Sequence, residues 1–346
     1  MARDGRILVY SPSFVWKKGS LSSEGADFLL SFEWRSFSVG VISSISEEKK
    51  IVRNHWCAFL SNNPSFRDRF FVQDEGDIHV VIDFGKDSVF FRIHPIILVG
   101  RYLKLARGIA QTRHYCYSCK GVGKKKGKLC FVCNGEKILT KESVQELIAP
   151  FVKEVFQCEE VLFHGAGRED VDVRMLGNGR PFALTLENPR VRIVDVLQLM
   201  KKINHALLGK VELIELQLGV SRDVARIMQT YHTKKYRALV ESLEKISIRK
   251  LDSFLHQKID VIQTTPSRVE KRRAMKERFH WVVLEKVTQI DSHHIEMELH
   301  ASQGCYIKEF ISGDNGRSVP SFSSWLASPC TCIELDVLAI LDESLF

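Results

Sequence analysis

The chain has 346 residues, 45% hydrophobic and 27% charged, which is typical of a soluble globular protein with two or three domains. No apolar run approaches the roughly 20 residues that span a bilayer, and the charged start of the chain is unlike a secretory signal. We therefore expect an intracellular protein, cytoplasmic or nuclear. Its net charge of +8 favours an acidic partner such as nucleic acid.

The first third of the chain predicts a small α+β unit. Apolar residues recur at helical spacing between residues 45 and 66 and predict a helix. Residues 78–84 and 88–93 are expected to form two strands joined by a turn. The segment 95–110 mixes apolar residues with basic ones, and we expect a basic amphipathic helix there.

Two cysteine pairs follow, Cys116-x-x-Cys119 and Cys130-x-x-Cys133, separated by ten residues that include three glycines. Two such turns facing each other make a tetrahedral site, whose default metal is Zn²⁺. Four sulfur ligands leave no open coordination position, so we expect a structural metal. A redox dithiol pair and four unrelated buried cysteines are the alternatives. The odd total of nine cysteines fits a reducing compartment better than a disulfide framework.

Helices and strands are expected to alternate from residue 139 to the end. A 3.6-residue apolar stripe predicts a helix over residues 144–155, and residues 280–284 are expected to form a strand. We expect a domain over 1–113, a cysteine segment over 114–138 at the junction, and a second domain over 139–346.

The segment 164–182 combines four glycines with an acidic triplet, Glu169, Asp170 and Asp172, and with three arginines. Glycine allows sharp turns and close approach to a ligand, and arginine binds phosphate in two-pronged fashion. A carboxylate beside such cations stays ionised. The combination suggests chemistry on a nucleotide, and the alternative is a polar loop with local salt bridges.

Three later segments carry basic and aromatic residues: 233–240, 263–273 and 304–317. Taken singly, each also fits an ordinary structural role. These roles are a helix with one aromatic residue, a solvated charge run, and a strand that enters a turn.

Taken in order, these motifs resemble the archaeal and eukaryotic family of tRNA pseudouridine synthases that act on the TΨC arm. The resemblance covers roughly residues 78–341, including residues 100–112 and the cysteine pairs. Its main motifs are Gly167-Arg-Glu-Asp-Val-Asp-Val-Arg174 with Gly179-Arg-Pro-Phe182, Lys235-Tyr236-x-Ala-Leu-Val240, Thr265-Pro-x-Arg268-Val, Tyr306-Ile-Lys-Glu-Phe310 and Gly313-Asp-x-Gly-Arg317.

This resemblance implies an α+β protein with an N-terminal THUMP-containing RNA-binding domain and a zinc knuckle. A pseudouridine synthase domain would follow, built on a central mixed or antiparallel sheet flanked by helices. The implied activity converts uridine to pseudouridine at position 54, position 55 or both in tRNA, without an organic cofactor. We expect the chain to be a monomer.

The resemblance also implies roles for individual residues. Asp170 matches the aspartate that starts the reaction, and Tyr236 matches the active-site tyrosine. Lys308 matches a basic residue that we expect in a strand, paired with Asp170, because a buried carboxylate needs a nearby cation to stay ionised. Contacts to RNA are expected from basic residues in and near the motifs: Arg101, Lys104, Arg107, Arg168, Arg174, Arg268, Arg272 and Arg273.

Two other classes of function compete with this one. A non-catalytic RNA-binding protein on the same scaffold is the alternative, although such a protein has no need to keep all three catalytic residues. Another THUMP enzyme, such as a methyltransferase or a sulfur-inserting synthetase, is disfavoured. The sequence has no glycine-rich cofactor loop after a strand and no phosphate loop of the ATP-using kind.

Overall fold

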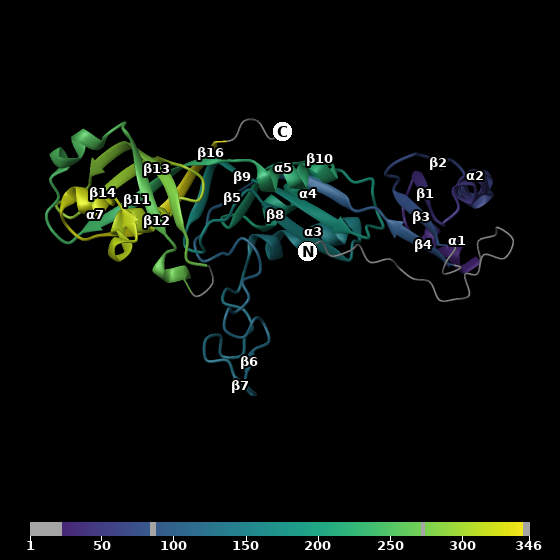
Figure 1. The fold of residues 1–346 in the computed structure, drawn as a ribbon, viewed down its shortest axis with the longest axis horizontal. Helices are drawn as coiled ribbons and strands as arrows, with labels where there is room; N and C mark the ends of the chain where they lie inside the picture. The colour runs from purple at the N-terminus through teal and green to yellow at the C-terminus, as the bar shows by residue number, and fades with distance from the viewer. Residues whose placement is uncertain (1–22, 84–87, 271–273, 342–346) are drawn as a thin grey trace.

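The computed structural model describes residues 23–83, 88–270 and 274–341 of the chain. A small N-terminal unit and a larger second unit follow each other along the long axis of the molecule, and a narrow segment projects from the larger one (Figure 1). In the described ranges, no helix is long and apolar enough to cross a membrane.

The N-terminal unit is a four-stranded sheet with the order β2-β1-β3-β4 and two helices. In α2 the buried side chains Val52, Trp56 and Leu60 recur every four residues, whereas Ile51, expected on that face, is exposed. The expected helix and both expected strands are confirmed. The elements are α1 (Ser23–Leu30), β1 (Ser36–Ile42), α2 (Ser46–Asn62), η1 (Pro64–Phe66), β2 (Phe70–Phe71), β3 (Ile78–Asp83) and β4 (Ser88–Ile93).

The second unit contains a sheet with the order β10-β5-β9-β16-β11-β14-β13-β12-β15, and β8 pairs with β9 beside this path. Strands β16 and β9 run parallel and the other pairs are antiparallel, so the sheet is mixed, as expected. The strands are β5 (Ile96–Lys104), β8 (Glu160–Gly165), β9 (Arg174–Glu187), β10 (Val211–Gly219), β11 (Thr233–Ser242), β12 (Lys258–Thr264), β13 (Glu277–Gln289), β14 (His294–Ala301), β15 (Ser318–Val319) and β16 (Cys330–Leu341).

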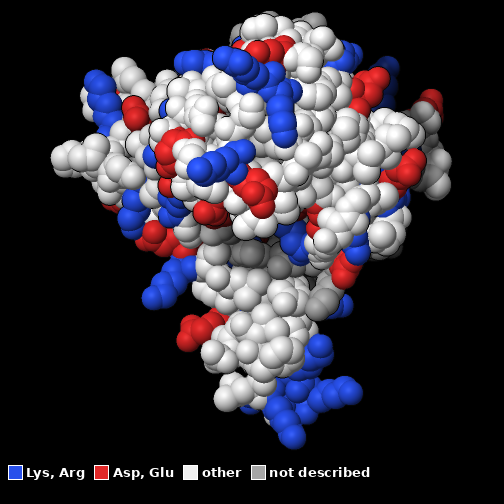
Figure 2. Space-filling model, turned by 90° about the vertical axis from the view of Figure 1, so that its left-hand side faces the viewer, with Lys and Arg blue, Asp and Glu red and all other residues white. Residues whose placement is uncertain are grey.

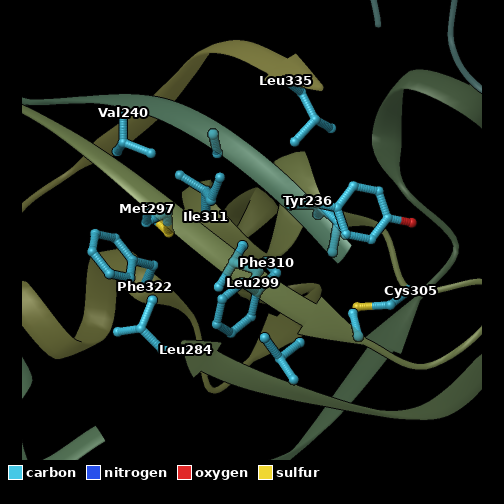
Figure 3. Close-up of a cluster of buried hydrophobic side chains, with 14 of the residues drawn as sticks. Tyr236, Val240, Leu284, Met297, Leu299, Cys305, Phe310, Ile311, Phe322 and Leu335 are labelled. Carbon is cyan, nitrogen blue, oxygen red and sulfur yellow. The ribbon is translucent and has the colours of Figure 1, made fainter. Parts of the chain in front are cut away.

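Helices pack against both halves of this sheet. Helices α3 and α4 cover β5, β9 and β10, whereas α6 and α7 cover β11, β14 and β13 over the core shown in Figure 3. Helix α5 packs on the opposite face of β5 and β9. The helix expected over residues 144–155 is confirmed. The helices are α3 (Val144–Phe156), α4 (Val196–Ala206), α5 (Ser221–Gln229), η2 (Ile248–Phe254), η3 (Ser267–Val269), α6 (Ile307–Ser312), η4 (Asp314–Gly316) and α7 (Phe322–Leu326).

Strand β5 occupies the segment expected to form a basic amphipathic helix, so that prediction is wrong. The apolar run at its start is short, and periodicity alone does not separate helix from strand in such a run. Its alternate residues face two different cores, Leu98 in one and Val99 in the other. Gly100 also suits the strand, because a Cβ there would lie 2.1 Å from the carbonyl oxygen of Glu215 on β10.

The position of β5 also moves the boundary between the two units. The strand pairs with β9 on one side and β10 on the other, so it belongs to the larger sheet. The two sheets therefore divide between β4 and β5, not after residue 113 as expected. The sequence does not reveal this, because both partner strands lie beyond residue 173.

Residues 114–138 form the projecting segment between β5 and α3, which we call the finger. It contains a two-stranded antiparallel ribbon, β6 (Lys124–Lys125) and β7 (Lys128–Leu129). The lysines of this ribbon and of its turn are exposed. Figure 2 shows basic side chains gathered at the far end of the finger.

Candidate active site

Asp170 lies in the loop of residues 166–173 between β8 and β9, which we call the aspartate loop. The ammonium of Lys104 on β5 donates hydrogen bonds to the carbonyl oxygens of Asp170 and Val171, at 3.0 and 3.3 Å. Lys104 therefore holds the loop backbone from the sheet side. Its side chain was expected to contact RNA, but it is 0% exposed, so the structure contradicts that role.

Glu169 anchors the aspartate loop through contacts that its side chain makes in the protein interior. Its buried carboxylate accepts a hydrogen bond from the hydroxyl of Tyr102 at 2.9 Å and lies 2.7 Å from Nε of the buried Arg180. Lys104 lies 4.0 Å from the same carboxylate. Gln111 donates a hydrogen bond to the Tyr102 hydroxyl. Burial and the charge of Glu169 raise the pKa of Tyr102 well above its ordinary value, so this phenol stays protonated and keeps donating.

Asp170 faces two cations from other parts of the chain. Its Oδ2 lies 3.0 Å from Nη1 of Arg268 and 3.8 Å from Nζ of Lys308. The closer partner of Lys308 is Asp172, at 2.6 Å. Burial of Asp172 opposes ionisation, but the hydrogen bond and charge of Lys308 outweigh it and lower the pKa of Asp172.

The expected pairing of Lys308 and Asp170 in a strand therefore needs correction. Lys308 lies in the first turn of α6, and Arg268 is the nearer cation to Asp170. The Asp170 side chain is 41% exposed and that of Lys308 is 24% exposed, so this is not a buried pair. The sequence places neither cation, because η3 and α6 meet the aspartate loop only in the folded chain.

This exposure predicts a small effect of Lys308 on stability. We expect Lys308→Met to change the free energy of unfolding by no more than about 1 kcal/mol, because partly exposed ion pairs contribute little. Urea unfolding of the variant and the wild type measures the difference. A loss of about 3 kcal/mol or more would instead indicate a buried pair.

Tyr236 lies in the middle of β11, between Leu299 of β14 and Val337 of β16. Its ring belongs to the hydrophobic core, and its hydroxyl points out of that core (Figure 3). Burial, reinforced by the nearby Cys305, raises the pKa of Tyr236 far above its ordinary value. The hydroxyl is therefore a neutral donor at physiological pH, which fits a ring that stacks on a base better than a general base.

A pocket of about 610 Å³ brings these residues together. Asp170, Tyr236, Arg268 and Lys308 all line it, so three separated sequence motifs meet the aspartate loop at one place. Such a pocket is large enough to hold a single nucleotide. The lining also includes residues that the sequence analysis did not single out: Arg113, Tyr115 and Tyr117 at the base of the finger, and Lys234 and Val337 on the sheet.

A family model described as "Pus10, C-terminal" matches residues 97–341, which include the whole pocket. The chain belongs to the Pus10 family. The match begins in β5, at the division between the two sheets.

Several relatives in the Pus10 family carry the name "tRNA pseudouridine synthase Pus10". That of Methanocaldococcus jannaschii is 43% identical over 78% of this chain and 58% of its own length. That of Archaeoglobus fulgidus is 38% identical over 76% of this chain and 72% of its own length. The chain thus spans little more than half of the first of these relatives.

Among solved structures, a chain in "Crystal Structure of a Cbf5-Nop10-Gar1 Complex" aligns with 58% of this chain and 46% of its own length. It does so at a TM-score of 0.33 and 17% identity. A likeness at this level carries no functional information.

The other expected RNA contacts of this Pus10-family chain divide into three groups. Arg168 and Arg268 line the pocket, and Arg168 is exposed there. Arg107 and Arg174 both bind the carboxylate of Asp336. Arg101 donates hydrogen bonds to the backbone carbonyl oxygens of Asn178 and Gly179 in β9. The structure thus gives these three arginines partners within the protein. Arg272 and Arg273 lie outside the described residues.

The four cysteines of the finger lie together, as expected. Their sulfur atoms are all within 4.8 Å of one another, and the residues are buried. Sγ of Cys116 lies 3.8 Å from that of Cys130, and Sγ of Cys119 lies 3.6 Å from that of Cys133. These distances are too long for disulfides. They match the roughly 3.8 Å that separates sulfurs around a tetrahedral Zn²⁺ with bonds of about 2.3 Å.

Proposed function

We propose that this chain is a cofactor-free tRNA pseudouridine synthase that converts uridine to pseudouridine at position 54, position 55 or both in the TΨC arm. The observation that carries the proposal is the pocket. It is lined by Asp170, Tyr236, Arg268 and Lys308, in a chain of the Pus10 family. A pocket for one extruded nucleotide is what such a reaction needs, because the target uracil must leave its stack.

In the proposed reaction, Asp170 starts the cleavage of the bond between C1′ of the ribose and N1 of uracil. It would do so by attack on the sugar or by removal of a proton from it. The detached uracil turns, C5 bonds to C1′, and the proton on C5 is replaced by one on N1, so the product is an isomer of the substrate. Arg268 and Lys308 would hold two positive charges beside the Asp170 carboxylate in the pocket.

RNA binding is proposed for three regions of the chain. Arg168 and Arg268 would contact phosphates at the pocket. The exposed lysines of the finger would extend this contact along the tRNA, because a basic surface attracts the phosphate backbone. We further propose that the N-terminal unit is a THUMP-containing RNA-binding domain and that residues from 97 onwards form the catalytic domain. We also propose that the chain acts as a monomer.

We propose that the four cysteines of the finger hold one structural Zn²⁺. The four sulfur ligands fit its preferred donor set and its tetrahedral geometry. A closed four-sulfur site has no position for substrate, so the metal would stabilise the finger and take no part in the isomerisation.

This assignment predicts about one zinc per chain in purified protein, measured by atomic emission. Chelation should unfold the finger and expose its buried cysteines to a thiol reagent, because metal binding supplies folding energy for such segments. A folded, active preparation without metal would contradict the assignment.

The proposed activity is tested with a tRNA transcript that carries tritium at C5 of uridine. The wild-type chain is expected to release tritium to water, because C5 loses its proton when it bonds to the ribose. A transcript with cytidine at positions 54 and 55 is the control and should release none from the TΨC arm. No release from the uridine transcript by folded protein would contradict the proposal.

A further inference from the structure

Lys234 on β11 is a buried lysine whose side chain lines the active-site pocket. The residue is 7% exposed and lies two residues before Tyr236, so the two side chains are on the same face of the strand. A Cβ added to Gly167 of the aspartate loop would lie 3.7 Å from Nζ of Lys234. The ammonium therefore lies against the loop that carries Asp170.

This ammonium has no hydrogen bond or ion pair with any residue that the structure describes. The carboxylate whose negative charge acts on it is that of Glu169, which is already bound by Arg180 and Tyr102 and lies 4.0 Å from Lys104. Three buried cations thus depend on the charge of one buried carboxylate. An unpaired buried charge is costly, so a fold that keeps one at a pocket indicates a ligand with a complementary charge.

The depth of Lys234 indicates which part of a nucleotide it meets. Phosphates stay at the mouth of such a pocket, where the exposed side chains of Arg168 and Arg268 lie. An extruded base enters first and is recognised at its hydrogen-bonding edge in the interior. Lys234, on the same strand face as Tyr236, faces that interior.

We propose that the ammonium of Lys234 donates a hydrogen bond to a carbonyl oxygen of the extruded uracil and stabilises the negative charge of the detached base. This inference rests on the proposed function. When the bond between C1′ and N1 breaks, its electron pair stays on the uracil and is shared by N1, O2 and O4. A fixed cation in a dry site stabilises such charge strongly.

Lys235 provides a matched control, because it is the next residue on β11 and points to the opposite face. It forms an ion pair with Glu285 at 2.8 Å outside the pocket. Lys234→Met and Lys235→Met remove the same charge from the same strand. Only the first removes it from the pocket.

Three measurements on the full chain test the proposal with a tRNA transcript. Lys234→Met should lower the single-turnover rate of pseudouridine formation by about 100-fold or more, the effect of removing one donor to a developing anion. Its affinity for tRNA in filter binding should stay within about threefold, because phosphate contacts dominate affinity. Its melting temperature should be unchanged or higher, because methionine removes an unpaired buried charge. Lys235→Met should stay within about threefold of the wild type in rate.

The pH dependence of the rate tests the charge itself. Burial, with the positive charge of Arg180, lowers the pKa of Lys234 to about 8, against opposing effects of Glu169 and Cys305. Because the protonated form is the active one, the rate at subsaturating tRNA should fall as pH rises through about 8. Two other groups of the pocket are kept from titrating there, because burial raises the pKa of Cys305 to about 12 and raises that of Tyr236 far above its ordinary value. Lys234→Arg should move this fall to higher pH, because arginine stays charged.

Each other outcome overturns the inference. Equal rates for Lys234→Met and the wild type would reject it while leaving the proposed function intact. A lower melting temperature together with the lost rate would assign Lys234 a structural role. A fall near pH 8 that persists in Lys234→Arg would point to Lys104, whose pKa burial also lowers to about 8. A wild type that forms no pseudouridine would reject the proposed function as well.

Discussion

Replacing Asp170 by asparagine is expected to abolish pseudouridine formation while leaving tRNA binding intact. The substitution removes one charge and keeps the shape of a side chain that is 41% exposed. The aspartate loop should keep its fold, because Lys104 and Glu169 hold it through contacts that do not involve the Asp170 carboxylate. We expect tritium release from C5-labelled tRNA to fall by at least about 1000-fold, as when an essential catalytic group is lost.

Asp172→Asn is the matched control for this substitution. It removes a carboxylate of the same loop that is 66% exposed and bound to Lys308. We expect its rate to stay within about tenfold of the wild type, because Asp172 would act only by orienting Lys308. Full tritium release from Asp170→Asn, or equal losses in the two variants, would reject the assignment of Asp170.

The largest effect on stability is expected for Glu169→Gln. Among the residues that the structure describes, Glu169 is the one carboxylate within 4.0 Å of both Arg180 and Lys104, whose side chains are 1% and 0% exposed. Removing its charge takes this counter-charge from both of them and from the buried Lys234 nearby. Loss of one partner from a buried ionic cluster typically costs about 3–5 kcal/mol, and we expect a loss of this size in the free energy of unfolding.

Urea unfolding at neutral pH measures this loss, and Glu142→Gln serves as its control. Glu142 pairs with Lys210 at 2.7 Å on the surface, with side chains 39% and 47% exposed. Such a pair should contribute at most about 1 kcal/mol. If Glu169→Gln lowered the free energy of unfolding by no more than Glu142→Gln does, the buried cluster would not be what holds the aspartate loop.

The parts of this protein that could be predicted from its sequence are those with a local signal. The stripe that starts at Val144 specifies α3, because a helix repeats its contacts every three to four residues. The spacing of the cysteine pairs specifies the cluster in the finger, because each pair lies on one turn. The order and spacing of the motifs also indicate the family.

The features of the site that could not be predicted depend on residues that are distant in the sequence and meet only in the folded chain. Arg268 and Lys308 lie about one hundred or more positions from Asp170, and only the structure shows that Arg268 is the nearer of the two. Lys104 was expected on a basic amphipathic helix, but pairing of β5 with β9 and β10 buries it. Lys234 carried no separate signal, because two consecutive lysines give the same sequence pattern whether the first of them faces a pocket or solvent.

Under the proposed function, this pocket isomerises uridine in the TΨC arm of tRNA. The most direct measurement is chemical mapping of pseudouridine, position by position, in an unmodified tRNA transcript after incubation with the wild-type chain. We expect pseudouridine at position 54, position 55 or both. After incubation with Asp170→Asn we expect none at these positions. A transcript left as uridine at both positions by folded protein that binds it would contradict the proposed function.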